Sequence, residues 1–163
     1  MKRNSLLILF LFTCVNLYSQ SVGYSYRILA AEGCSMKYSV SKQDTSYYIV
    51  ASVHSDRMLY LNEPTMKIRT FQGDVFEVKG AVIGNTSESA GLMTGNIMIP
   101  VTEISSTAQF KVTPEQFELL KDGVAKIRLT MTPMNHERTF KKDKIGKKLY
   151  KLYLKARQQD EDF

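Results

Sequence analysis

Cysteine and histidine are scarce, and their scarcity limits the chemistry that this chain can carry. The 163 residues contain two cysteines, Cys14 and Cys34, and two histidines, His54 and His136. No H-E-x-x-H, C-x-x-C or comparable ligand spacing occurs, and no glycine-rich loop ends in a Walker lysine, so nothing in the sequence predicts a metal or a nucleotide cofactor. We therefore expect no metal site, no cofactor and no catalytic residue, in a protein that is not an enzyme.

The run His54-Ser55-Asp56 contains the residue types of a hydrolase triad in adjacent positions. Triad residues meet in space rather than in sequence, and neighbouring side chains of a strand point to opposite faces. The run therefore predicts the end of a strand rather than a catalytic relay. A spatially assembled site, with a histidine beside a carboxylate in a deep pocket, is the enzymatic alternative.

Long apolar runs are missing except near the N-terminus. There a basic start is followed by the apolar run Leu6–Phe12 and by small residues near position 19. This layout predicts a secretory signal peptide over residues 1–19, because the run is shorter than the 20 or so residues that span a bilayer. We expect an exported protein, periplasmic or secreted, with no transmembrane segment in the mature chain. Lipidation at Cys14, giving an outer-membrane lipoprotein, is the alternative.

Residues 20–163 have the length of one domain and contain no repeat. With the signal peptide removed, Cys34 is the only cysteine left, so no intramolecular disulfide can form. The domain must then be stabilised by its core, and Cys34 is expected to be a small buried side chain rather than a reactive thiol.

Positive charge is concentrated at the C-terminal end. Residues 20–136 hold eleven basic and eleven acidic residues, whereas residues 137–163 hold nine basic and five acidic residues. A basic tail beside a neutral body argues against a general nucleic-acid surface, and we expect no nucleic-acid partner.

Alternating and β-branched runs predict seven or eight strands separated by turns. The clearest are Tyr24–Ala30, Ser35–Val40, Tyr47–Val53, Met66–Thr70, Phe76–Val78, Gly95–Ile104 and Val124–Thr132. Between them, the small polar residues Gly84–Gly91 predict a flexible loop, and Pro100 predicts an edge strand or a bulge. The fold class expected is mainly β, an antiparallel β-sandwich or a partly open barrel.

One short helix is expected before the last strand. Thr113 suits the N-cap, Pro114 the first helical position, and Gln116 the third residue of a capping box. Gly123 follows the helix, where a left-handed residue ends it. From there the period changes to two, which predicts a strand with Lys126 and Arg128 on its solvent face.

A family resemblance rests on two segments. The run T-P-E-Q-F-E-L-L-K-D-G-V-A-K-I-R at residues 113–128, with F-K-K-D-K-I-G-K-K-L at residues 140–149, resembles the C-terminal half of small secreted proteins of the bacterial cell envelope. The resemblance covers about a third of the chain and implies a β-rich architecture. It implies no functional residue.

An amphipathic basic helix is expected at about residues 141–157, with Ile145, Leu149, Leu152, Tyr153 and Ala156 at helical spacing. Its lysines are the candidate contacts for an anionic surface, and peripheral contact with a membrane is one option for them. The interpretation that we favour is that the apolar face packs on the sheet while the lysines are solvated, as in most amphipathic helices of globular domains. These lysines are Lys141, Lys144, Lys147, Lys148, Lys151 and Lys155.

From these features we expect a non-catalytic module of the bacterial cell envelope that binds another envelope protein or a surface polymer. The alternative is a carrier of lipids or small molecules that uses the interior of the β structure as a pocket.

Overall fold

A computed structural model describes residues 21–26, 34–56 and 58–158. The predicted signal peptide at residues 1–19, with the alternative lipidation site at Cys14, lies outside the described residues. The last four residues of the predicted strand Tyr24–Ala30 also lie outside them.

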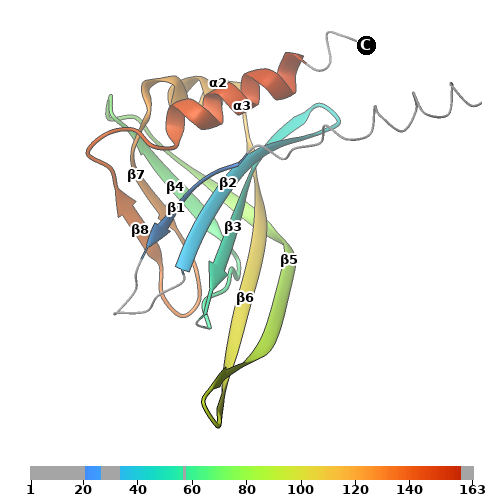
Figure 1. Cartoon of the computed structure of the whole chain (residues 1–163). Helices are drawn as coiled ribbons and strands as arrows, with labels where there is room; N and C mark the ends of the chain where they lie inside the picture. Colours follow the sequence, from blue (N-terminus) through green and yellow to red (C-terminus); the bar gives the residue numbers. More distant parts are fainter. Residues whose placement is uncertain (1–20, 27–33, 57, 159–163) are drawn as a thin grey trace, which may run out of the picture.

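Eight antiparallel strands form one sheet, with the order β1-β2-β3-β6-β5-β4-β7-β8. The sheet curls into a half-barrel (Figure 1), which confirms the expected mainly β fold with a partly open barrel. The strands are β1 (Val22–Tyr26), β2 (Cys34–Gln43), β3 (Ser46–Ser55), β4 (Thr65–Thr70), β5 (Val75–Thr94), β6 (Ile97–Val112), β7 (Val124–Leu129) and β8 (His136–Thr139).

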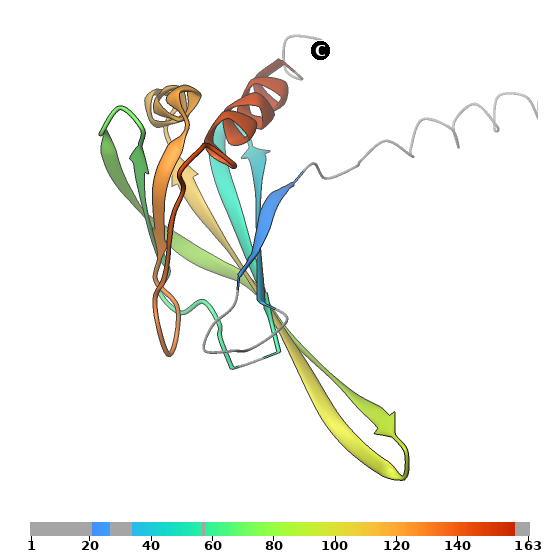
Figure 2. The same cartoon turned by 60° about the vertical axis from the view of Figure 1, so that its left-hand side comes forward.

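The helices lie at one end of the half-barrel. They are α2 (Pro114–Leu119), the short 3-10 helix η1 (Leu120–Asp122) and α3 (Gly146–Gln158). In both overall views these helices lie at the top, while the far ends of β5 and β6 project beyond the sheet at the opposite end (Figures 1 and 2).

The core fills the concave side of the sheet. Strand alternation sends every second side chain inward, so that in β3 Ile49, Ala51 and Val53 have no exposed surface while the residues between them are partly exposed. Tyr38 and Phe110 are also fully buried. Full burial of a large apolar side chain contributes about 1.5–3 kcal/mol. The core therefore stabilises the described part of the chain without a disulfide, as expected for a protein whose Cys34 is buried and free.

The helix expected after residue 113 is confirmed in detail. The Thr113 hydroxyl accepts from the backbone N–H of Gln116, and the Gln116 side chain accepts from the backbone N–H of Thr113, which completes the capping box. Pro114 is the first helical residue. Gly123 ends the 3-10 helix with φ +84°, a conformation that favours glycine.

The C-terminal helix is shorter at its start than the predicted range of 141–157. It begins at Gly146, because the Asp143 carboxylate accepts backbone N–H groups of Gly146 (2.8 Å) and Lys147 (2.9 Å) and so holds the chain before the first turn. Gly146 is therefore the first residue of the helix, not an interior residue that weakens it.

The prediction of a flexible loop at Gly84–Gly91 is wrong. These residues belong to β5, and they pair with β6 from Gly84↔Thr107 to Gly91↔Pro100. The small polar side chains suited a loop, but pairing with a long neighbouring strand overrides the local preference. The predicted strand Gly95–Ile104 is confirmed from Ile97 onward as the first part of the 16-residue strand β6, which continues to Val112, whereas Gly95 and Asn96 form the turn between β5 and β6.

Candidate functional site

The six predicted contact lysines lie in or just before α3, and all are exposed. The opposite face of the helix packs on the core: Leu149 is fully buried, and Tyr153 stacks on Phe117 with ring centroids 4.4 Å apart. Tyr47 of β3 meets Tyr153 edge-on at 4.9 Å. The apolar face of the helix therefore packs on the core, as the favoured interpretation predicted. Contact of the lysines with an anionic surface stays a prediction.

A second candidate surface is the two-stranded arm, which we define as residues 88–103. β3 pairs with β6 only as far as Ser55↔Ile104, and β4 pairs with β5 only as far as Thr65↔Lys79. Beyond these points β5 and β6 pair with each other alone, and Figure 2 shows the arm projecting away from the rest of the sheet. Seven residues of β5 in the arm span roughly 20 Å at the usual strand rise.

The tip of the arm carries exposed apolar side chains. Met93, Ile97 and Met98 are 64%, 67% and 67% exposed. Gly95, with φ +63°, starts the two-residue turn that joins the strands. No charged residue occurs from position 89 to position 102. The tip is therefore an uncharged apolar surface held clear of the core.

The edges of the arm differ from each other. β5 contains no proline, and from residue 81 to residue 94 its outer edge has no neighbouring strand among the described residues. β6 contains Pro100, which lacks an N–H, on a stretch with no β3 partner. This placement confirms the prediction of an edge position for Pro100. The β5 edge is the one that presents a full row of backbone donors and acceptors.

A third candidate surface is the outer face of β4 and β7, where four cations are adjacent. The strand register places Lys67 opposite Arg128 and Arg69 opposite Lys126. We call these four residues the basic face. Like charges directly opposite each other destabilise a sheet by tenths of a kcal/mol, so this arrangement carries an electrostatic cost.

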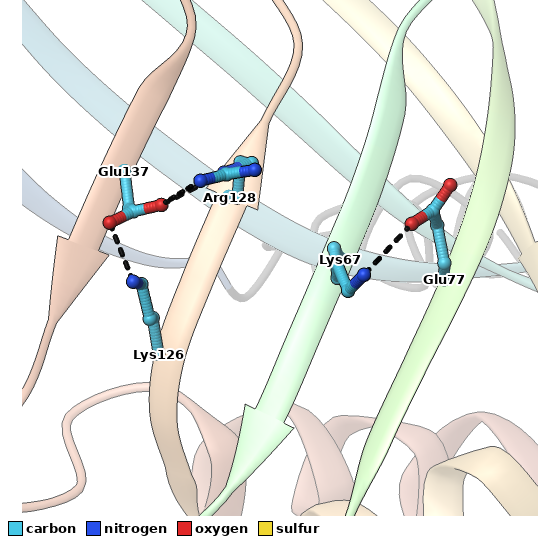
Figure 3. A network of polar contacts seen from close by, with 5 residues as sticks. All are labelled: Lys67, Glu77, Lys126, Arg128 and Glu137. Atoms are coloured by element: carbon cyan, nitrogen blue, oxygen red, sulfur yellow. Dashed lines mark hydrogen bonds and ion pairs between the residues drawn. The ribbon is translucent and has the colours of Figure 1, made fainter.

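Two glutamates flank the basic face (Figure 3). Glu137 of β8 pairs with Lys126 at 2.6 Å and with Arg128 at 2.7 Å, whereas Glu77 of β5 pairs with Lys67 at 3.5 Å. Lys67 and Glu77 are directly opposite each other in the β4–β5 register, so their ion pair is a cross-strand one. Hydrogen bonds from Lys126 and Arg128, assisted by their charges, lower the pKa of Glu137 and keep it ionised.

A shallow depression of about 200 Å³ lies over this region. Its lining consists of the basic face, Val75 and Glu137. Within the described part of the chain, Arg69 makes no ion pair. The lining of the depression therefore includes a guanidinium group that no carboxylate of the described chain neutralises.

The histidines lie apart. His54 is half-buried on β3, and its neighbour Ser55 points to the core, where it hydrogen-bonds Cys34 at 3.2 Å. The run His54-Ser55-Asp56 thus ends a strand, as predicted. His136 of β8 lies 2.9 Å from the Tyr24 hydroxyl of β1.

Tyr24 and His136 join the two ends of the strand order, and we call this contact the seam. Their rings stack at 5.8 Å, and Phe140 packs edge-on against Tyr24 at 5.5 Å. Burial, and secondarily the positive charge of Arg138, lowers the pKa of His136 to about 4. Burial also raises the pKa of Tyr24 to about 12, so both side chains are neutral at pH 7.

Within residues 21–26, 34–56 and 58–158, no three His, Cys, Asp or Glu side chains group closely enough to hold a metal ion. In the same residues no helix has the length and apolar character needed to cross a membrane. Comparison of the chain with protein-family models, with curated proteins and with solved structures found no match.

Proposed function

We propose that this protein is a non-catalytic module of the bacterial cell envelope that binds another envelope protein through the β5–β6 arm. The observation that carries the proposal is the arm itself, a two-stranded ribbon with an uncharged apolar tip. The basic and apolar N-terminal sequence, typical of a secretory signal peptide, supports the location in the envelope.

Binding of a protein partner to the apolar tip would be favourable, because it would bury side chains that now contact water. Met93, Ile97 and Met98 leave most of their surface in water, and burial of apolar surface is worth about 25 cal/mol per Å². A membrane partner is less favoured, because no lysine or arginine occurs between Gly80 and Phe110 to meet anionic lipid head groups.

The open β5 edge suggests how such a partner would bind. An extended segment of another protein could add to residues 81–94 as a further strand, with backbone hydrogen bonds giving affinity. Glu88 lies within this edge and directly opposite Glu103 on β6. Two adjacent carboxylates favour a partner strand that presents lysine or arginine at that position.

The carrier alternative has less support. Tyr38, Phe110 and Met36 have no exposed surface on the concave side of the sheet, so they occupy the space that a ligand would need. Native mass spectrometry of protein taken gently from the envelope would favour the carrier if a lipid-sized adduct were found. A mass that begins at Cys14 with acyl chains would instead favour a lipoprotein.

Site-specific photo-crosslinking in the native host tests the arm. A photoreactive residue at position 98 should capture one envelope protein, whereas the same residue at position 58, where Met58 is 76% exposed but lies off the arm, should not. The purified partner should then bind the wild-type chain at least tenfold more tightly than a Met93→Ser, Ile97→Ser, Met98→Ser variant. Met58→Ser is the matched control.

Equal capture at positions 58 and 98 would contradict the proposal. So would a purified partner whose affinity is unchanged by the three tip substitutions.

A further inference from the structure

The basic face carries more positive charge than its ion pairs neutralise. Two like-charged cross-strand pairs, Lys67 with Arg128 and Arg69 with Lys126, lie next to each other on the same side of β4 and β7. With Glu77 and Glu137 included, four cations face two carboxylates, which leaves a local charge of +2. A sheet surface with this arrangement is more stable when an anion is bound.

The four cations are also well placed to act together. Registered neighbours on adjacent strands lie about 5 Å apart, and residues two apart on one strand lie about 7 Å apart. All four side chains line the same depression of about 200 Å³. One anionic group inside it can therefore reach several cations at once, and the guanidinium groups of Arg69 and Arg128 provide forked donors suited to an oxyanion.

We propose that the basic face is a binding site for a phosphate monoester carried by a saccharide. This site is separate from the arm and does not depend on the protein partner proposed above.

The local charge favours phosphate over carboxylate. A phosphate monoester carries a charge of about −1.5 to −2 at pH 7 and three acceptor oxygens, which matches the +2 of the site, whereas a carboxylate carries a single charge. Binding of phosphate would compete with Glu137 for Lys126 and Arg128, because both anions use the same donors.

The shape of the site favours a sugar as the carrier of the phosphate. The lining forms a depression of about 200 Å³, which has room for a phosphate and part of a sugar ring, rather than a plane that would lie against many lipid head groups. Val75 is 45% exposed in the lining and offers an apolar surface to the C–H groups of a sugar ring. Lys67, also in the lining, can donate hydrogen bonds to sugar hydroxyls.

Isothermal titration calorimetry on the mature chain, residues 20–163, tests the site with glucose 6-phosphate as the probe. We expect saturable binding that weakens as salt rises, with weaker binding of inorganic phosphate and glucuronate and none of glucose. Arg69→Gln should weaken binding about tenfold, because it removes a charged donor that makes no ion pair in the described chain.

Glu137→Gln is the most discriminating variant, because it is expected to raise the affinity for glucose 6-phosphate, whereas Arg69→Gln is expected to lower it. Without the competing carboxylate, Lys126 and Arg128 are released for the ligand, and affinity should rise several-fold. The double variant Lys148→Gln, Lys151→Gln removes two exposed charges from α3 and is the matched control, with unchanged affinity. Circular dichroism spectra that match the wild type would show that the variants are folded.

Several outcomes would overturn the assignment. If the α3 control variant bound glucose 6-phosphate more weakly than the wild type, or if Glu137→Gln did not bind it more tightly, the basic face would not be the binding site. If inorganic phosphate bound as tightly as glucose 6-phosphate, or if the chain bound only to vesicles that contain phosphatidic acid, a saccharide would not be the carrier of the phosphate. The variant with three serines at the arm tip should bind the probe normally, so failure here and failure of the proposed function can be told apart.

Discussion

Asp143 shows how one side chain can organise several backbone groups. Its carboxylate accepts the N–H of Val124 at 2.9 Å in addition to those of Gly146 and Lys147, so it joins the start of β7 to the start of α3. Partial burial raises the pKa of Asp143, but these backbone hydrogen bonds outweigh that effect and leave the pKa below its ordinary 3.8.

Replacement of Asp143 by alanine should lower the free energy of unfolding by about 1–2 kcal/mol at pH 7. Because the pKa is depressed in the folded state, the stabilisation is present above the unfolded pKa near 3.8 and is lost as pH falls below it. The difference between wild type and variant should therefore shrink in acid. Urea unfolding at pH 7 and at pH 3 measures it, and an equal difference at both pH values would contradict this role.

At the scale of elements, the junction of β7 and α3 depends on a close backbone contact. A Cβ atom on Gly146 would lie 2.5 Å from the backbone nitrogen of Val124 and 2.8 Å from the carbonyl carbon of Gly123. Neither of these backbone atoms can move without displacing β7 or the turn before it.

Gly146→Ala should therefore destabilise the protein by about 1–3 kcal/mol, although alanine is the better helix former. Lys148→Ala, on the exposed face of the same helix, is the control and should stay within about 0.5 kcal/mol of the wild type. Thermal or urea unfolding of both variants makes the comparison. A Gly146→Ala variant more stable than the wild type would contradict a close contact between position 146 and the backbone of Gly123 and Val124.

Local sequence signals explain which elements could be predicted. The capped helix was predicted because Thr113, Pro114, Gln116 and Gly123 act within a few residues of one another. The start of α3 was missed because Asp143 acts on a helix that also requires β7 in place, which is a contact between distant parts of the chain.

The arm was missed for a related reason. Glycine, serine and asparagine from position 84 to position 91 suit a loop, and only the length and register of β6 make them a strand. The basic face was predicted in part, because the alternation after Gly123 places Lys126 and Arg128 on the solvent face of their strand. The adjacency of all four cations depends on the β4–β7 pairing, which no local pattern encodes.

On the scale of the whole molecule, charge and apolar surface are separated along its length. The lysines of α3 lie at one end, whereas the arm, whose only charges are Glu88 and Glu103, projects from the other (Figures 1 and 2). The basic face lies on the solvent-facing side of β4 and β7, apart from both of these regions. A protein bound to the arm and a saccharide bound to the basic face would therefore occupy different surfaces.

The half-barrel shape itself depends on the seam, since β1 and β8 are the two ends of the strand order. Tyr24 and His136 hold these strands near each other by side-chain contacts. His136 is only 6% exposed, and the folded state therefore favours its neutral form.

Acid should loosen the seam before it unfolds the sheet. Because the pKa of His136 falls from 6.5 to about 4 on folding, the stabilisation that comes from its neutral form is complete above pH 6.5 and is lost as pH falls towards 4. Hydrogen exchange in β1 and β8, corrected for the intrinsic rate, should therefore accelerate between pH 7 and pH 4.5, while β3 stays protected. His136→Phe keeps a ring against Tyr24 and removes the titrating group, so the acceleration should disappear; if it persisted, another group would control the seam.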